Sequence, residues 1–296
     1  MLDNNLLEAF GLVLDCGGFE KAAKSLFISQ SAVSQRIKQL EDYMGQVLIV
    51  RTSPPRATSA GRQLFKHYKQ VKCLENEVLS NVLSGAKNKY TVLTVGVNAD
   101  SLATWFYDII SEFTIENNVL INIIVDDQDE TRKLLKDGEV VGCISASNEL
   151  IQGCSYHYLG SMQYSFAANK NFCQKWFGNG VSYASAADAP TVMFNTKDNL
   201  HYKLFKNIFQ KIPPEFNTHY MPSPERLLDA VLSGLGYGAV PNMQADKYFK
   251  NGELVDIFPG VYIDVNLYWH CWNIDFNYLK QFTSEIQIKS RELLTH

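Results

Sequence analysis

The residues best suited to a defined chemical task are a group of polar and cationic side chains between positions 29 and 38. The group consists of Ser29, Gln30, Ser31, Ser34, Gln35, Arg36 and Lys38. Proteins read the edges of base pairs in the major groove of DNA with amide, hydroxyl and guanidinium groups of this kind. Val33, Ile37 and Leu40 recur at helical spacing in the same stretch, and Ser29 is a suitable N-cap. The pattern predicts a helix with one face in a core and the other available to DNA.

The preceding residues predict the elements that would position this helix. Apolar residues spaced as in a helix occupy positions 6–14, and a second, shorter helical pattern occupies 19–26. Residues 27–29 leave only a tight connection to the polar helix, as in a helix-turn-helix. The alternative is an ordinary three-helix bundle whose polar face contacts only solvent.

A basic hairpin, or wing, is predicted after the polar helix. Residues 46–51 are β-prone, and the turn that follows them contains Pro54 and Pro55. Arg51 and Arg56 flank this turn, so the wing is expected to present two guanidinium groups to the phosphates of DNA.

The two parts of the chain differ in charge. Residues 1–72 contain ten lysine and arginine residues and six acidic residues, a net charge of +4, whereas the whole chain has −4. A basic head on an acidic body fits a protein that contacts phosphates at one end only. Because the excess is small, we expect a single head to bind weakly and two paired heads to bind a duplex together.

A long helix is predicted between the head and the body. It begins after Thr58, a suitable N-cap, and runs for about 27 residues, roughly 40 Å, without a proline. Its apolar stripe consists of Leu64, Tyr68, Val71, Leu74, Val78, Val82 and Leu83. A stripe of this length cannot be buried in one small head, so it predicts pairing with a second copy in a dimer or tetramer. The alternative is that the helix lies on its own body. If the helix pairs with a second copy, residues 84–89 form a polar hinge to the body.

These segments resemble the winged helix-turn-helix of LysR-type transcriptional regulators. The similar residues are 22–41, Arg51 and 58–61, and further motifs carry the similarity along nearly the whole chain. Those motifs are Val97–Trp105, Gly138–Gly142 and Leu267–His270, which look like the ArgP/LysG branch of the family. The resemblance implies a regulator that binds double-stranded promoter DNA, responds to lysine or arginine, and controls genes of amino-acid export or metabolism. It also implies RNA polymerase as a partner.

The rest of the chain predicts an α/β fold. Strands are expected at 92–97, 120–125, 140–145, 164–168 and 191–194, with helices from about 102 and over 130–137, 199–210 and 224–233. This alternation favours parallel sheets. The resemblance implies two subdomains like those of periplasmic binding proteins, with the chain crossing between them near 160 and 265.

The expected organisation therefore has three parts. Residues 1–58 are the winged helix-turn-helix DNA-binding domain, 59–88 the dimerisation helix and hinge, and 89–296 the effector-binding domain. Subdomain I is expected at about 89–160 and 265–296, and subdomain II at about 161–264.

A ligand site is expected where the strands end, because ligands of open α/β sheets bind beyond the carboxyl ends of the strands. Asn98, Asp100, Ser101 and Thr104 follow the first strand of the body. The hydroxyls of Ser101 and Thr104 can donate to an α-carboxylate; the alternative for Ser101 is a simple N-cap.

A cationic ligand also needs an acidic partner. Asp127, at the end of the second strand, is the first choice, with Asp100 and Asp126 as substitutes. The alternative is that residues 126–130 are a solvated turn and the acidic start of a helix. A loop after another strand can close over the ligand from the opposite side, and its residues are Phe194, Asn195 and Thr196.

Two conspicuous motifs are assigned to the fold. The glycines 234, 236 and 238 resemble a phosphate-binding run, but they follow a predicted helix and lead into a strand, unlike the dinucleotide fingerprint. Residues 268–272 are mostly aromatic and predict the core of a late strand, so His270 is interpreted as a core residue rather than a metal ligand.

Several classes of protein are not expected. There is no run of about 18 apolar residues that predicts a membrane span, and the first residues lack the pattern of a secretory signal. The six cysteines lack Cys-x-x-Cys spacing, which favours a reducing cytoplasm over disulfides or a zinc site, although a redox pair of Cys143 and Cys154 stays open. The six histidines are isolated, so neither an enzyme nor a metal or cofactor is expected.

The second hypothesis is an architectural or replication-associated DNA-binding protein without an effector response. Added lysine or arginine separates the two hypotheses, because a specific ligand raises thermal stability and an irrelevant one leaves it unchanged.

Overall fold

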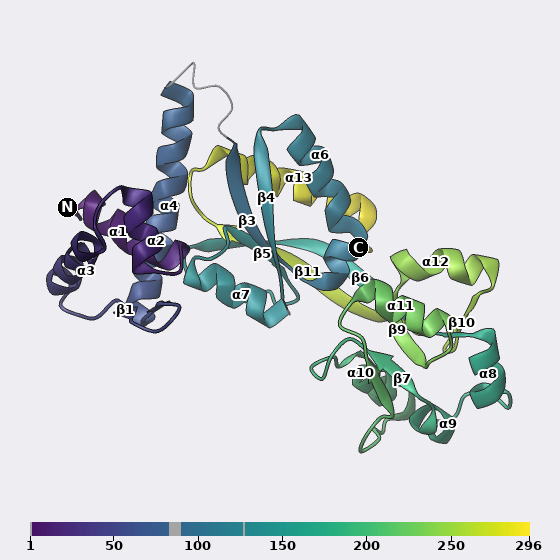
Figure 1. The fold of residues 1–296 in the computed structure, drawn as a ribbon. Coiled ribbons are helices and arrows are strands. Elements are labelled where there is room, and N and C mark those ends of the chain that lie inside the picture. The colour runs from purple at the N-terminus through teal and green to yellow at the C-terminus, as the bar shows by residue number, and fades with distance from the viewer. Residues whose placement is uncertain (1, 83–89, 127) are drawn as a thin grey trace.

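A computed structural model describes residues 2–82, 90–126 and 128–296 (Figure 1). The head of the molecule, at the left of the figure, contains three helices and a small hairpin. They are α1 (Asn4–Asp15), α2 (Phe19–Leu26), α3 (Gln30–Met44), β1 (Ile49–Val50) and β2 (Arg56–Ala57). The predicted helix-turn-helix and wing are both present, and the hairpin pairs its strands antiparallel.

The head is held together by the apolar faces that the spacing predicted. Val33, Ile37 and Leu40 of α3 are buried against α1 and α2. The hydroxyl of Ser29 accepts the N–H of Ala32 at 3.2 Å and so caps α3. The helix ends at Gly45, whose φ of +68° suits glycine.

The long helix α4 (Ser59–Val82) begins as predicted, because the Thr58 hydroxyl accepts the Gly61 N–H at 3.0 Å. Its first turns belong to the head core, where Tyr68 lies so close to α1 that a Cβ at Gly11 would be 2.1 Å from the tyrosine ring. Towards its end, by contrast, Val78 and Val82 are 58% and 70% exposed. Leu83 and the predicted hinge, 84–89, lie outside the described residues.

The described part of the body is built on one nine-stranded sheet in the order β4-β3-β5-β11-β6-β9-β7-β8, with β10 paired to β6. The strands are β3 (Thr91–Val97), β4 (Val119–Val125), β5 (Gly142–Ser145), β6 (Cys154–Asn169), β7 (Thr191–Met193), β8 (Thr218–Tyr220), β9 (Tyr237–Pro241), β10 (Leu254–Asp256) and β11 (Ile263–Trp272). Two parallel groups, β4-β3-β5 and β9-β7-β8, are joined by the antiparallel pair β6 and β11.

We call the part around β3, β4 and β5 lobe I, and the part around β7, β8 and β9 lobe II. Lobe I carries α5 (Ala99–Ser101), a π-helical turn η1 (Leu102–Phe106), α6 (Tyr107–Glu116), α7 (Gln128–Asp137) and α13 (Asn277–Leu293). Lobe II carries α8 (Lys170–Phe177), α9 (Tyr183–Asp188), α10 (Leu200–Phe209), α11 (Pro224–Leu232) and α12 (Asn242–Asn251). The chain passes between the lobes along β6 and again along β11.

Two expectations about the body need correction. The strand predicted at 164–168 is only the buried end of β6, because the polar residues before Tyr164 concealed the longer strand. The first helix of lobe I begins at Ala99 rather than near 102, with Asn98 as its N-cap residue.

The motifs assigned to the fold lie where they were predicted. The glycine run links the end of α11 to β9, and His270 is buried in β11, where its Nε2 lies 2.7 Å from the carbonyl oxygen of Ser147. None of the described helices combines the length and apolar character needed to cross a membrane.

Candidate functional site

The polar face of α3 is open to solvent. Gln30, Ser31, Gln35 and Lys38 are exposed, while Ser34 and Arg36 are half-buried. Ser29 differs from the others because its hydroxyl already caps the helix and lies 2.8 Å from the Ser31 hydroxyl. The side chains around Gln30 are therefore the ones that α3 can present to base edges.

The wing carries two arginines, Arg51 just after β1 and Arg56 at the start of β2. Val50 pairs with Arg56 across the hairpin, and the Thr52 hydroxyl donates to the Pro54 carbonyl at 2.7 Å in the turn. The guanidinium carbon of Arg51 lies 5.4 Å from the centre of the Phe19 ring, a cation–π contact that orients an otherwise exposed side chain. The head thus combines a helix with an exposed polar face and a hairpin that carries two guanidinium groups.

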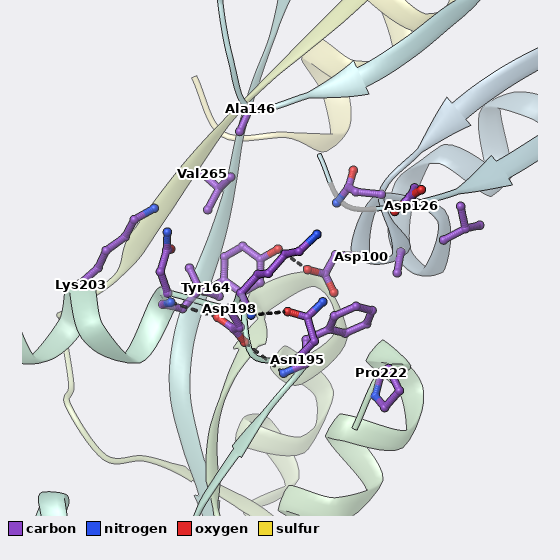
Figure 2. A pocket seen from close by; sticks show the side chains of 16 residues that line it. Asp100, Asp126, Ala146, Tyr164, Asn195, Asp198, Lys203, Pro222 and Val265 are labelled. Carbon is purple, nitrogen blue, oxygen red and sulfur yellow. Dashed lines mark hydrogen bonds between the residues drawn. The ribbon is translucent and has the colours of Figure 1, made fainter. Parts of the chain in front are cut away.

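A second candidate site is a cavity of about 670 Å³ between the lobes (Figure 2). It lies where several strands end: Asn98 follows β3, Val125 ends β4 and Phe194 follows β7. The lining residues are Asn98, Ala99, Asp100, Val125, Asp126, Ala146, Tyr164, Phe194, Asn195, Lys197, Asp198, Asn199, Leu200, Lys203, Pro222 and Val265. The position agrees with the general rule for ligands of α/β sheets.

The charged residues of the cavity are sorted between the lobes. Asp100 and Asp126 come from lobe I, whereas Lys197 and Lys203 come from lobe II. Asp198, also from lobe II, is committed to its own loop, because its carboxylate accepts the N–H groups of Phe194 at 3.1 Å and Leu200 at 3.0 Å. Lobe I therefore offers carboxylates to a ligand, and lobe II offers ammonium groups.

Asp100 is the carboxyl group whose environment is most unusual. Figure 2 shows it facing Tyr164, whose hydroxyl donates to the Asp100 Oδ2 at 2.6 Å. Burial raises the pKa of Asp100 to about 6, and the neighbouring carboxylate of Asp198 adds to the rise, although the hydrogen bond from Tyr164 opposes it. Among the described residues, this half-buried carboxyl receives one hydrogen bond from a neutral donor, which makes it well suited to receive a cation.

The structure separates the predicted ligand residues into groups. Asn98, Asp100, Phe194 and Asn195 line the cavity, as does the substitute acid Asp126. The first-choice acid, Asp127, lies outside the described residues. Thr196 is not part of the lining.

The two hydroxyls expected to hold a carboxylate do not line the cavity. Ser101 is completely buried, and Thr104 donates its hydroxyl to the carbonyl of Asp100 at 2.6 Å, one turn earlier in the same helix. Threonine forms this bond to the preceding turn readily, so its hydroxyl is turned away from a ligand.

Sequence reasoning missed Tyr164, Lys197, Lys203 and the role of Asp198. Tyr164 is indistinguishable from a core aromatic within a strand. The Asp198 loop had a recognisable signal, since an Asn or Asp side chain that accepts backbone N–H groups two residues on is typical of a turn.

The cysteines that were left open as a redox pair are buried thiols. Burial raises the pKa of Cys143 to about 12 and also raises that of Cys154. Redox-active cysteines require a thiolate and an exposed position, so the structure gives no support to this alternative.

The chain matches two family models and several known proteins. Residues 4–62 match the bacterial regulatory helix-turn-helix protein, lysR family, and residues 89–272 match the LysR substrate binding domain. The chain is 36% identical over 285 residues to the HTH-type transcriptional regulator ArgP of Vibrio vulnificus (strain YJ016), a match that covers 96% of each protein.

Solved structures agree with these matches. The crystal structure of ArgP from Mycobacterium tuberculosis has a TM-score of 0.92 and 36% identity, covering 100% of this chain and 99% of that one. Full-length LysG from Corynebacterium glutamicum with bound effector Arg has a TM-score of 0.84 and 29% identity, covering 100% of both chains. The family predicted from the sequence is thereby confirmed: the chain belongs to the LysR family of bacterial DNA-binding transcriptional regulators.

Proposed function

We propose that this regulator senses a basic amino acid, lysine or arginine, in the cavity between its lobes and adjusts transcription of amino-acid export or metabolism genes in response. The observation that carries the proposal is the half-buried carboxyl of Asp100 in the cavity wall, with Asp126 on the same lobe. The arginine bound to the similar LysG structure supports the same ligand class.

The distribution of charged residues between the two lobes indicates the orientation of the ligand in the cavity. A guanidinium or ammonium group pairs with the carboxylates of Asp100 and Asp126, and the ligand carboxylate faces Lys197 and Lys203 of the opposite lobe. A zwitterion placed in this way bridges the lobes and therefore favours an arrangement in which the lobes are closed over the cavity. The shift from the open to the closed arrangement can be no larger than the difference between the ligand's affinities for the two.

The DNA-binding part of the proposal uses the residues predicted from the sequence. Gln30, Ser34, Gln35 and Arg36 enter the major groove, while the wing contacts the backbone. We further infer that residues 1–58 act as the DNA-binding domain, 59–88 as the dimerisation helix and hinge, and 89–296 as the effector domain.

Partners and location complete the proposal. The exposed apolar end of α4 binds a second copy, giving a dimer or tetramer, and the assembly acts on RNA polymerase in the cytoplasm. A cavity with opposite charges on its two walls argues for an effector response over a purely architectural role.

The test is calorimetric titration of the full-length protein with L-arginine, L-lysine and L-leucine. We expect the two basic amino acids to bind and leucine not to bind, and we expect Asp100→Asn to abolish binding of both. The variant should retain its fold, because asparagine can still accept the Tyr164 hydroxyl. Absence of binding by either basic amino acid to the wild type would contradict the proposal.

A further inference from the structure

Helix α7 connects the ligand cavity to the helix that carries the DNA-binding head. The helix follows Asp126, a lining residue of the cavity, and ends at Asp137 beside α4. Ten helical residues span about 15 Å. Figure 1 shows α7 lying along the edge of lobe I with one end next to α4.

The contact between α7 and α4 is close and specific. Arg62 of α4 places its Nε 3.1 Å from the Asp137 Oδ1. The next residue, Gly138, has a φ of +83°, and a Cβ there would lie 2.6 Å from the Cα of Lys66. Only glycine lets the end of α7 approach the backbone of α4 this closely.

Two further contacts attach α4 to lobe I. The Lys66 ammonium donates to the carbonyl of Gln152, just before β6, at 3.2 Å and lies 3.7 Å from the Sγ of Cys154, the first residue of β6. About three turns after Lys66, the Glu77 carboxylate accepts the N–H of Asn277 at 3.1 Å, at the start of α13. These contacts attach α4 to lobe I along most of its length.

The other side of α7 is fixed to the sheet. Thr131 donates its hydroxyl to the carbonyl of Ile144 at 2.9 Å, and Leu135 is completely buried. Because α7 is fixed to the sheet on one side and to α4 on the other, it cannot shift without moving α4. A ligand that changes the position of lobe I relative to lobe II therefore also changes the position of the head relative to lobe II.

We propose that Arg62, Lys66 and Asp137 are the residues that couple the ligand cavity to the DNA-binding head. They position α4 and do not contact ligand, and the inference rests on the proposed ligand site. Without the Arg62–Asp137 pair the ligand still binds, but α4 follows lobe I less closely, and the affinity for DNA responds much less to the ligand.

The pair is suitable for testing because it contributes little to folding. The side chains of Arg62 and Asp137 are 44% and 20% exposed, and ion pairs at such positions are weakly stabilising. Asp137→Asn and Arg62→Gln therefore remove the attraction while the fold persists. The double variant Arg62→Asp with Asp137→Arg restores it with the charges exchanged.

Glu112→Gln is the matched control. Glu112 pairs with Lys289 at 2.8 Å between α6 and α13, also within lobe I but with no part of α4 involved. A general effect of removing an ion pair from lobe I would show in this control as well.

The experiment measures two dissociation constants for the full-length protein. One is for L-arginine by calorimetry, and the other is for a DNA fragment selected by the wild type from a random pool, with and without saturating L-arginine. In the two single variants we expect both the arginine constant and the ligand-free DNA constant to stay within about twofold of wild type, while the arginine-induced change in DNA affinity falls at least about fivefold. The exchanged double variant and Glu112→Gln should respond as the wild type does.

Three results would overturn the inference. An unchanged arginine response in both single variants would show that the pair does not carry the coupling. An arginine constant weakened about tenfold would place Asp137 in the ligand site instead. Failure of the wild type to bind arginine would contradict the proposed function itself. The wild-type measurement alone distinguishes this outcome from a failure of the coupling inference.

Discussion

At the scale of single residues, the chemistry of the cavity depends on one carboxyl group, that of Asp100, whose pKa is raised by burial. Among the described residues, Asp100 accepts one hydrogen bond, from Tyr164, and burial raises its pKa to about 6. A folded-state pKa above that of the unfolded chain means that the native protein holds this proton more tightly. Its contribution to stability is therefore present at low pH and is lost as the pH rises from about 4 through about 6.

The substitution Asp100→Asn removes this pH-dependent loss of folding stability. The variant should be more stable than wild type at pH 7.5, by up to about 3 kcal/mol, and equal to it at pH 4. Thermal denaturation of both proteins at the two pH values checks the prediction, because titration of all other groups is common to both. A variant that is less stable than wild type at pH 7.5 would show that the carboxylate is stabilised in the fold.

The polar residues of α3 give a second prediction at this scale. Gln30→Ala and Arg36→Ala should each weaken binding to a selected operator by about 1–3 kcal/mol, with a smaller effect on random DNA. Fluorescence anisotropy with both DNAs measures the difference. Equal losses on the two DNAs would show that these side chains contact phosphates rather than bases.

At the scale of elements, α4 has two different environments along one apolar stripe. Leu64 and Tyr68 are buried in the head, and Leu74 packs against the core of lobe I, so the predicted pairing with a second copy does not apply to this half of the stripe. Val78, Leu79 and Val82 are 58%, 52% and 70% exposed. The exposed half is long enough to pair with the same half of a second helix.

Val78→Asp combined with Leu79→Asp should shift the protein towards the monomer, because two charges at the centre of an apolar helix pair are strongly unfavourable. Sedimentation velocity measures the shift, and circular dichroism checks that the helices persist. Leu235→Asp is the control, since Leu235 is also exposed, at 45%, but lies in lobe II. An unchanged sedimentation coefficient would exclude this end of α4 from the interface.

The wing is the second element with a clear expectation. Arg56→Ala should weaken binding to every DNA sequence and reduce the slope of log K against log salt by about 1, because one fewer counterion is released. Binding measured between about 50 and 200 mM salt gives the slope. A slope identical to wild type would remove Arg56 from the DNA contact.

Local patterns were sufficient for some elements and insufficient for others. The cap at Ser29 and the spacing of Val33, Ile37 and Leu40 predicted α3, because each of these signals lies within one or two turns. The partner of Asp100 could not be predicted, since Tyr164 is 64 positions away and only the sheet brings the two together. The same reason explains why the opposing charges of Lys197 and Lys203 were missed.

At the scale of the whole molecule, the lobes share a continuous sheet instead of being joined by flexible linkers. The two long strands β6 and β11 pair along ten residues of β11, with a change of register between Leu267 and Tyr268. Movement between the lobes must therefore bend or twist these two strands. The resemblance implied the crossings near 160 and 265, but composition and spacing alone would not have found them.

The position of β11 within the sheet also determines when the regulator becomes complete during its synthesis. This strand lies between β5 and β6, although more than ninety residues of chain separate it from either, and it supplies Val265 to the cavity wall. The ribosome releases the head and the start of α4 long before it releases β11. A nascent chain therefore contains every residue of the head core while its ligand cavity still lacks a wall, so the proposed response to a ligand is the last property that the newly made protein can acquire.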